Sequence, residues 1–324
     1  MSLIDPLAVR DLSPLRGAMA DPAREKVLHG GEYDLSLLKR DHGFEFEAVF
    51  DTQIAARFCG IAEPGLQSLL ERELGVGHSK SRAVQRSDWS RRPLSDAQLQ
   101  YAAEDVRHLL ALRDRLLRRL GALGREAWVR EECEALARAP GGVHREPAEA
   151  RRAKGARELD GRQRAVLREL FRLREEWARE ADLPLFKVAG DDALLSLALR
   201  PPGDAEALRR ARGLSWHIRE RRAAEVLEAI RRGTSGPEEA AGPAPVFRSR
   251  PPREAFRRMD RLKAWRAEAA AKLGLDPGLL LPQRLIDRIA LDAPSTPEAM
   301  ASVPGLRRWR AETFGTELLK ALQP

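Results

Sequence analysis

The sequence has few cysteines, few lysines and no long apolar run, and the first and last of these shortages each exclude a class of protein. Two cysteines in 324 residues are too few for a disulfide framework or a cysteine-based zinc cluster. No apolar run approaches the roughly 18 residues that indicate a membrane span. The first residues lack the basic and apolar regions of a secretory signal. We therefore expect a soluble, cytoplasmic protein with no membrane partner.

Basic residues are abundant, but nearly all of them are arginine. The chain has 8 lysines and 49 arginines, and its formal net charge is +8. Residues 1–140 carry a net charge of −1, whereas residues 141–324 carry +9. A basic half is typical of a protein that binds a polyanion such as nucleic acid, but a solvated surface without a partner explains the same balance. Charge alone leaves both interpretations open.

Two segments rich in proline, glycine and charged residues divide the chain. They cover residues 140–160 and 234–252 and have the composition of linkers. Residues 1–139 show short strand patterns that alternate with helical patterns, whereas residues 161–233 and 253–324 show helical patterns only. We predict three domains joined by two linkers.

The two helical regions are related by an internal repeat. A shift of 92 residues places residues 170–230 on residues 262–322 without a gap. Identical pairs include Leu170/Leu262, Arg174/Arg266, Pro202/Pro294, Gly213/Gly305 and Leu214/Leu306. The helices expected in the two copies cover residues 162–181 and 254–273, 191–199 and 283–291, and 215–232 and 307–322. The pattern predicts two copies of one small all-α domain.

The N-terminal region is predicted to be α/β. Strands are expected at residues 2–9, 26–29 and 48–50, helices at 31–43, 51–60 and 65–75, and a basic loop at 78–93. Asp51 is expected to be the N-cap of its helix. Ser95 and Gln98 have the spacing of a capping box, and the apolar stripe after them predicts one helix that ends at Gly121.

Tyr101 and Asp105 lie one turn apart on that helix and therefore share a face. Taken alone, this spacing is more typical of a surface hydrogen bond than of a functional pair. However, the order of KVLHGGEYDLSLL, FDTQIAARFCG, RSDWSRRPL and LQYAAEDVRHLLAL resembles the ribonuclease D family of DEDD 3′–5′ exonucleases. The helical copies resemble HRDC domains, two of which follow the exonuclease domain in that family. The resemblance implies an α/β ribonuclease H-like exonuclease domain followed by two small all-α HRDC-like domains.

The resemblance also implies a catalytic apparatus. Enzymes of this kind hold two divalent metal ions with four carboxylates and hydrolyse RNA from its 3′ end, and oxygen ligands suit Mg²⁺ or Mn²⁺. Asp34 and Asp105 match two of the metal-binding aspartates, and Tyr101 matches the tyrosine that orients the attacking water. These three are the implied catalytic residues. The alternative for Asp34 is a carboxylate that stabilises the first turn of its helix through the helix dipole.

The first motif of the family, an Asp-x-Glu on the opening strand, has no match before the segment SLIDPL. The resemblance therefore implies an exonuclease domain that is N-terminally incomplete, with half of its metal carboxylates missing. We expect the chain as given to have little or no exonuclease activity. A start missed upstream in the reading frame explains this, and the alternative is a pseudoenzyme that only binds nucleic acid.

Two clusters of cationic residues near tryptophans are candidate nucleic-acid contacts. The first comprises Lys80, Arg86, Arg91 and Arg92 beside Trp89, and the second comprises Arg307, Arg308, Trp309 and Arg310. Arginine can hold phosphates, and tryptophan can stack on bases. For the first cluster, the alternative is that Asp88 and Trp89 fix the loop to its domain and that the arginines around them are solvated. We expect the partner to be structured RNA with a free 3′ end, such as a tRNA precursor.

Overall fold

The computed structural model describes residues 2–9, 11–77, 81–141, 155–211, 213–237 and 252–323. The chain forms two compact units, one from Met1–Gly142 with Pro251–Pro324 and the other from Val143–Arg250. The predicted linker residues 142–154 and 238–251 lie outside the described residues. Within the described residues no helix is both long enough and apolar enough to span a membrane.

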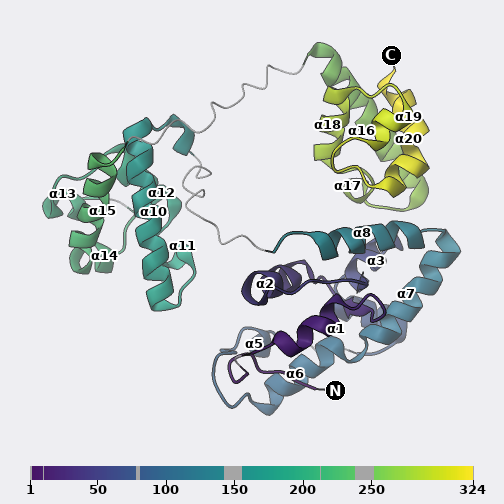
Figure 1. Ribbon diagram of the computed structural model, residues 1–324, viewed down its shortest axis with the longest axis horizontal. Helices are drawn as coiled ribbons and strands as arrows, with labels where there is room; N and C mark the ends of the chain where they lie inside the picture. Colours follow the sequence, from purple (N-terminus) through teal and green to yellow (C-terminus); the bar gives the residue numbers. More distant parts are fainter. Residues whose placement is uncertain are drawn as a thin grey trace. The chain divides into compact units, whose positions relative to one another are not determined.

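The first unit begins with a two-stranded parallel sheet. Figure 1 labels most of the helices of this part. Strand β1 (Lys26–Leu28) pairs with strand β2 (Val49–Asp51), with Lys26 opposite Val49 and Leu28 opposite Asp51. The helices of this part are α1 (Arg16–Ala20), α2 (Glu32–His42), α3 (Thr52–Phe58), α4 (Leu66–Leu69), α5 (Arg82–Gln85), α6 (Asp96–Arg107), α7 (Leu109–Leu123) and α8 (Glu126–Arg138). Short η1 (Ser13–Leu15) precedes α1, and a π-helical turn, η2 (Leu70–Leu74), follows α4.

The strand expected at residues 2–9 is wrong. The chain turns there, because the N–H groups of Ala8 and Val9 both donate to the carbonyl oxygen of Asp5. Pro6 fixes the backbone at the start of this turn and offers no N–H to a sheet. The strands expected at 26–29 and 48–50 are confirmed to within a residue or two.

The single helix predicted from Ser95 to Gly121 is interrupted. Ser95 and Gln98 form the expected capping box at the start of α6. At His108 the backbone leaves the helical region, with φ −105° and ψ 4°, and α7 begins at the next residue. The apolar stripe continues across the break, which is why the sequence pattern predicts one helix where the structure has two.

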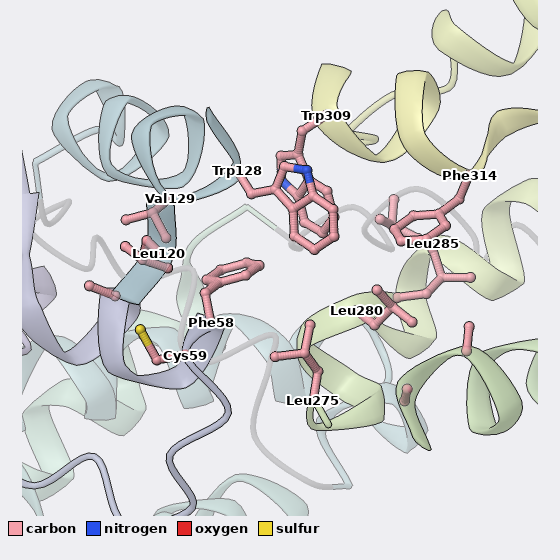
Figure 2. Packing of buried hydrophobic residues seen from close by; sticks show 14 of the residues in the cluster. Phe58, Cys59, Leu120, Trp128, Val129, Leu275, Leu280, Leu285, Trp309 and Phe314 are labelled. Atoms are coloured by element: carbon pink, nitrogen blue, oxygen red, sulfur yellow. The ribbon is translucent and has the colours of Figure 1, made fainter. Parts of the chain in front are cut away.

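The second part of the first unit is a five-helix bundle near the C-terminus (Figure 1). Its helices are α16 (Arg253–Leu273), α17 (Pro277–Leu280), α18 (Gln283–Asp292), α19 (Pro297–Ala301) and α20 (Arg308–Leu322). Its core is continuous with that of the sheet part, as Figure 2 shows for Phe58 of α3, Trp128 of α8 and Trp309 of α20. The two indole rings stack with their centroids 4.5 Å apart. These two parts therefore share one hydrophobic core.

The other unit is a bundle with its own core. It comprises η3 (Ala156–Glu158), α10 (Gly161–Ala181), α11 (Leu185–Val188), α12 (Asp191–Leu199), α13 (Ala205–Arg209), α14 (Trp216–Arg221) and α15 (Ala223–Ser235). Ala156 and Leu159, which we assigned to a linker, are buried in this core. The last helix expected at 215–232 is divided into α14 and α15, with Arg222 between them.

The internal repeat is preserved in side-chain contacts. Arg174 donates to the carbonyl oxygen of Ala189, and Arg266 donates to that of Leu281, so both donor and acceptor obey the 92-residue shift. Trp177 donates to Glu225, and Trp265 donates to Glu317, the residue equivalent to Glu225. Here only the acceptors obey the shift, because the position equivalent to Trp177 is Ala269. The two bundles are therefore copies in structure as well as in sequence.

Candidate active site

Tyr101 and Asp105 lie on one face of α6, and both are partly buried. One carboxylate oxygen of Asp105, Oδ1, is fully buried. Burial and the neighbouring charge of Asp105 raise the pKa of Tyr101 above its ordinary value of 10.0. The phenol therefore stays protonated at neutral pH and remains able to donate a hydrogen bond. The structure thus brings together two of the three predicted catalytic residues.

The loop before α6 packs against Tyr101. The Trp89 ring lies edge-on to the Tyr101 ring, with centroids 6.0 Å apart. The side-chain amide of Gln98 donates to Ser87 Oγ at 3.0 Å and to the carbonyl oxygen of Asp88 at 3.2 Å. The capping-box glutamine therefore also attaches the loop to the helix that carries Tyr101.

Asp34 occupies the first turn of α2 and is exposed. The turn before this helix is held by Asp51, whose carboxylate accepts the N–H groups of Gly30 and Gly31. The same carboxylate accepts the N–H groups of Gln53 and Ile54 at the start of α3. Asp51 is confirmed as the N-cap, and its buried carboxylate also positions the turn that presents Asp34.

The described residues do not complete a metal centre. Asp34 and Asp105 offer oxygen ligands of the kind that Mg²⁺ and Mn²⁺ prefer. Within the ranges that the structure describes, however, no group of three or more His, Cys, Asp or Glu side chains lies where it could hold a metal ion. The side chains present therefore do not fit a two-metal cage, and we derive no hydrolytic step through one. Cys59 and Cys133 add no ligand, because both are buried and burial raises their pKa to about 11 and about 12.

The basic loop only partly matches the prediction of a nucleic-acid surface. Arg86 is exposed, and Arg91 is exposed beside Asp88, 3.4 Å away. Arg92 instead donates two hydrogen bonds to the Asp5 carboxylate, at 2.5 and 2.6 Å, and lowers the pKa of Asp5 to about 2. Arg92 therefore connects this loop to the N-terminal turn, and its contact with nucleic acid stays a prediction. Lys80 lies outside the described residues.

The second cationic cluster is largely internal. Trp309 is only 3% exposed, and Arg310 donates to Glu132 at 2.6 Å and to the carbonyl oxygens of Leu279 and Leu280. A buried indole cannot stack on a base, and this guanidinium is fully engaged. The expectation that Trp309 and Arg310 contact nucleic acid is therefore wrong in this structure. Arg308 is exposed, and Arg307 is partly exposed, 3.4 Å from Glu132.

Comparison with known proteins explains the motif order. The 3′–5′ exonuclease family matches residues 1–121, and the HRDC domain family matches residues 163–230 and 255–322. A ribonuclease D from Granulibacter bethesdensis is 34% identical over 98% of this chain and 79% of its own. A ribonuclease D from Pseudomonas paraeruginosa is 34% identical over 99% of this chain and 84% of its own. This chain belongs to the ribonuclease D family.

A solved structure supports the same assignment. The crystal structure of Escherichia coli RNase D matches with a TM-score of 0.72 and 28% identity, and the match covers 98% of this chain and 84% of that one. The predicted order of an exonuclease domain and two HRDC domains is confirmed. Membership of this DEDD-type family implies use of divalent metal ions. The identity of the ion, the site residues, the domain boundaries and the missing first motif stay predictions.

Two structurally important side chains of this ribonuclease D relative, Glu131 and Glu132, were not predicted from the sequence. Glu131 accepts the N–H groups of Arg308 and Trp309, at 2.6 and 2.8 Å, and so caps α20 from a distant helix. Glu132 accepts the indole N–H of Trp309 and a hydrogen bond from Arg310. Burial tends to raise the pKa of Glu132, but Arg310 and these hydrogen bonds outweigh it and hold the pKa below 4.5. Their partners are about 177 residues away, so no local pattern marks them.

Proposed function

We propose that the protein is a 3′–5′ exoribonuclease of the ribonuclease D type that acts on structured RNA with a free 3′ end, including tRNA precursors. The observation that carries the proposal is the Tyr101–Asp105 pair, partly buried on one face of α6 in a domain that matches 3′–5′ exonucleases. The E. coli relative is described as an exoribonuclease involved in structured RNA processing, which supports RNA as the substrate class.

In this proposal each residue has a separate role. Tyr101 uses its protonated hydroxyl to orient the attacking water, and Trp89 limits where the phenol ring can move. Asp34 and Asp105 would each offer carboxylate oxygens to a divalent metal ion, Mg²⁺ or Mn²⁺, although the described side chains do not complete the set of ligands. The HRDC-like domains would hold the RNA outside the catalytic domain.

We further propose that residues 1–324 alone hydrolyse RNA slowly or not at all. Two carboxylates balance the charge of only one divalent cation, and the described strands β1 and β2 carry no Asp-x-Glu. A second candidate function follows from the same observation. With the metal set incomplete, the chain would bind nucleic acid without cleaving it.

One assay separates these functions. Purified protein is incubated with RNA labelled at the 5′ end, in Mg²⁺, in Mn²⁺ and in EDTA, and the products are resolved to single nucleotides. Slow, metal-dependent shortening from the 3′ end supports the exoribonuclease. RNA binding without any shortening supports the binding protein, and cleavage within the RNA contradicts both. A DNA strand of the same sequence tests whether binding and shortening require ribose rather than deoxyribose.

A further inference from the structure

A cleft of about 310 Å³ lies inside the first unit, and its described lining residues do not include Tyr101 or Asp105. Its walls come from the turn before α2, from α3 and α8, and from α17, α18 and the turn before α20. The cleft is thus formed jointly by the exonuclease domain and the second HRDC domain, whose cores are continuous. A site of this kind exists only while the two domains are packed together.

Cationic side chains reach this cleft from both domains. Arg57 of α3 and Arg284 of α18 line it and are exposed. Arg307 also lines it, 3.4 Å from Glu132. Among the residues that the structure describes, neither the Arg57 nor the Arg284 guanidinium pairs with a carboxylate. These two cations are therefore available to a ligand. Arginine matches the oxygens of a phosphate with a rigid fork of N–H donors.

Two of the three acidic side chains that line the cleft already accept hydrogen bonds from other groups of the protein. Asp51 accepts four backbone N–H groups, and Glu132 is engaged by Arg310 and Trp309. Glu32 is the remaining acidic side chain among the described lining residues. Positive charge thus exceeds available negative charge, and apolar side chains such as Ile54 and Leu279 complete the walls. Cations beside an apolar surface suit the alternation of phosphate and sugar along a nucleic-acid strand.

We propose that this cleft binds the phosphodiester backbone of an RNA strand, with Arg57 and Arg284 each contacting a phosphate. The choice of RNA rests on the proposed function, whereas the anion-binding chemistry rests on the cleft itself. The contact would extend the RNA footprint from the catalytic face to the junction with the second HRDC domain. RNA affinity would then depend on the two domains remaining packed.

The test measures RNA binding in EDTA, so that no cleavage is needed for the readout. Binding of a fluorescent single-stranded RNA is followed by anisotropy across a range of salt concentrations. Each lost phosphate contact on a single strand makes the slope of log affinity against log salt shallower by about 0.7. The double variant Arg57→Gln/Arg284→Gln should therefore bind more weakly, with a slope shallower by about 1.4.

Two further variants control for folding and for general charge. Arg118→Gln removes an exposed arginine of α7 that does not line the cleft, and we expect an unchanged slope. Glu32→Gln removes the uncommitted negative charge, and we expect tighter RNA binding, a gain that unfolding cannot produce. Thermal melting of every variant should match that of the unmodified chain.

The outcomes distinguish this inference from the proposed function. If the unmodified chain binds RNA and the double variant has an unchanged salt slope, the proposal that the cleft binds RNA is wrong. The exoribonuclease proposal is not affected by that result. An unmodified chain that binds no RNA overturns both. A shallower slope in the double variant but not in Arg118→Gln supports the cleft, whether or not the chain cleaves RNA.

Discussion

At the scale of single residues, Trp309 shows that a tryptophan flanked by arginines is compatible either with a nucleic-acid surface or with packing inside the protein. The sequence RRWR places cations around an indole, a pattern that suits nucleic acid as well as an internal contact. In the structure the Trp309 ring stacks on Trp128 and meets Phe58 and Phe314 edge-on. Its N–H is satisfied by Glu132, which lets a tryptophan be buried at low cost.

Replacing Trp309 with alanine should therefore destabilise the protein. Large-to-small substitution of a buried aromatic costs about 3–5 kcal/mol, and we expect this loss in the free energy of unfolding measured by denaturant titration. Trp216→Ala is the matched control, because Trp216 is 62% exposed near the equivalent position of the other repeat. We expect its effect to stay within about 0.5 kcal/mol. Equal stabilities for the two variants would contradict the packing described for Trp309.

Glu132 makes the stability of the first unit depend on pH. Its folded-state pKa is lowered, so its stabilising contribution is present above the ordinary value of 4.5 and is lost as pH falls through the folded-state value. Glu132→Gln should cost about 3 kcal/mol near neutral pH, because it leaves Arg310 buried without its counter-charge. This difference from the unmodified chain should shrink in melts below about pH 4.5.

Glu134→Gln provides the control on the same helix. Glu134 is exposed and forms only a surface pair with Arg138, 3.7 Å away. Such pairs contribute about 0–1 kcal/mol, so we expect little change at any pH. A Glu132→Gln difference that stays constant from pH 7 to pH 3 would show that its charge does not stabilise the contact.

At the scale of elements, Asp51 connects two helix starts. Its carboxylate accepts two N–H groups before α2 and two at the start of α3. Asp51→Ala should lower the free energy of unfolding by about 3 kcal/mol, since it removes a cap and leaves buried N–H groups unsatisfied. Asp51→Asn keeps one acceptor oxygen for the cap and should cost about 1 kcal/mol. If the two substitutions cost the same in denaturant titrations, the N–H groups before α2 do not depend on this carboxylate.

Helix starts were predicted correctly from the sequence where the hydrogen bonds that fix them join residues close together in the chain. The capping box at Ser95 and the N-cap at Asp51 were predictable because each uses neighbours within three residues. The break at His108 and the turn at residues 5–9 were not, because an apolar stripe and a short apolar run fit more than one backbone path. The repeat was predictable because its Gly, Pro and Leu positions recur at a fixed spacing.

At the scale of the whole molecule, the sequence identified the domains but not their grouping. Two similar bundles were expected, and the structure shows that the second shares a core with the exonuclease domain. This shared core depends on contacts such as Arg125 to the carbonyl oxygens of Phe58 and Leu273, which join segments far apart in the chain. Long-range pairings of this kind leave no periodic trace in a single sequence.

Only the part of the candidate site that lies on a single helix could be predicted from the sequence. Tyr101 and Asp105 follow from one helical turn, and the structure places them together on α6. Asp34 lies on α2, so its distance from α6 cannot be predicted from the spacing of residues along one helix. The cleft lined by Arg57 and Arg284 was not predicted, because its walls are brought together only by the packing of the second HRDC domain.

We propose that this ribonuclease D relative shortens RNA from its 3′ end and that Tyr101 and Asp105 take part in this reaction. The most direct measurement follows binding and shortening of one 5′-labelled RNA in Mn²⁺ for the unmodified chain, Tyr101→Phe and Asp105→Ala. We predict that all three bind the RNA with similar affinity, that any shortening by the unmodified chain is slow and starts at the 3′ end, and that this shortening is weaker in Tyr101→Phe and absent in Asp105→Ala. Shortening that survives in Asp105→Ala would contradict the claim.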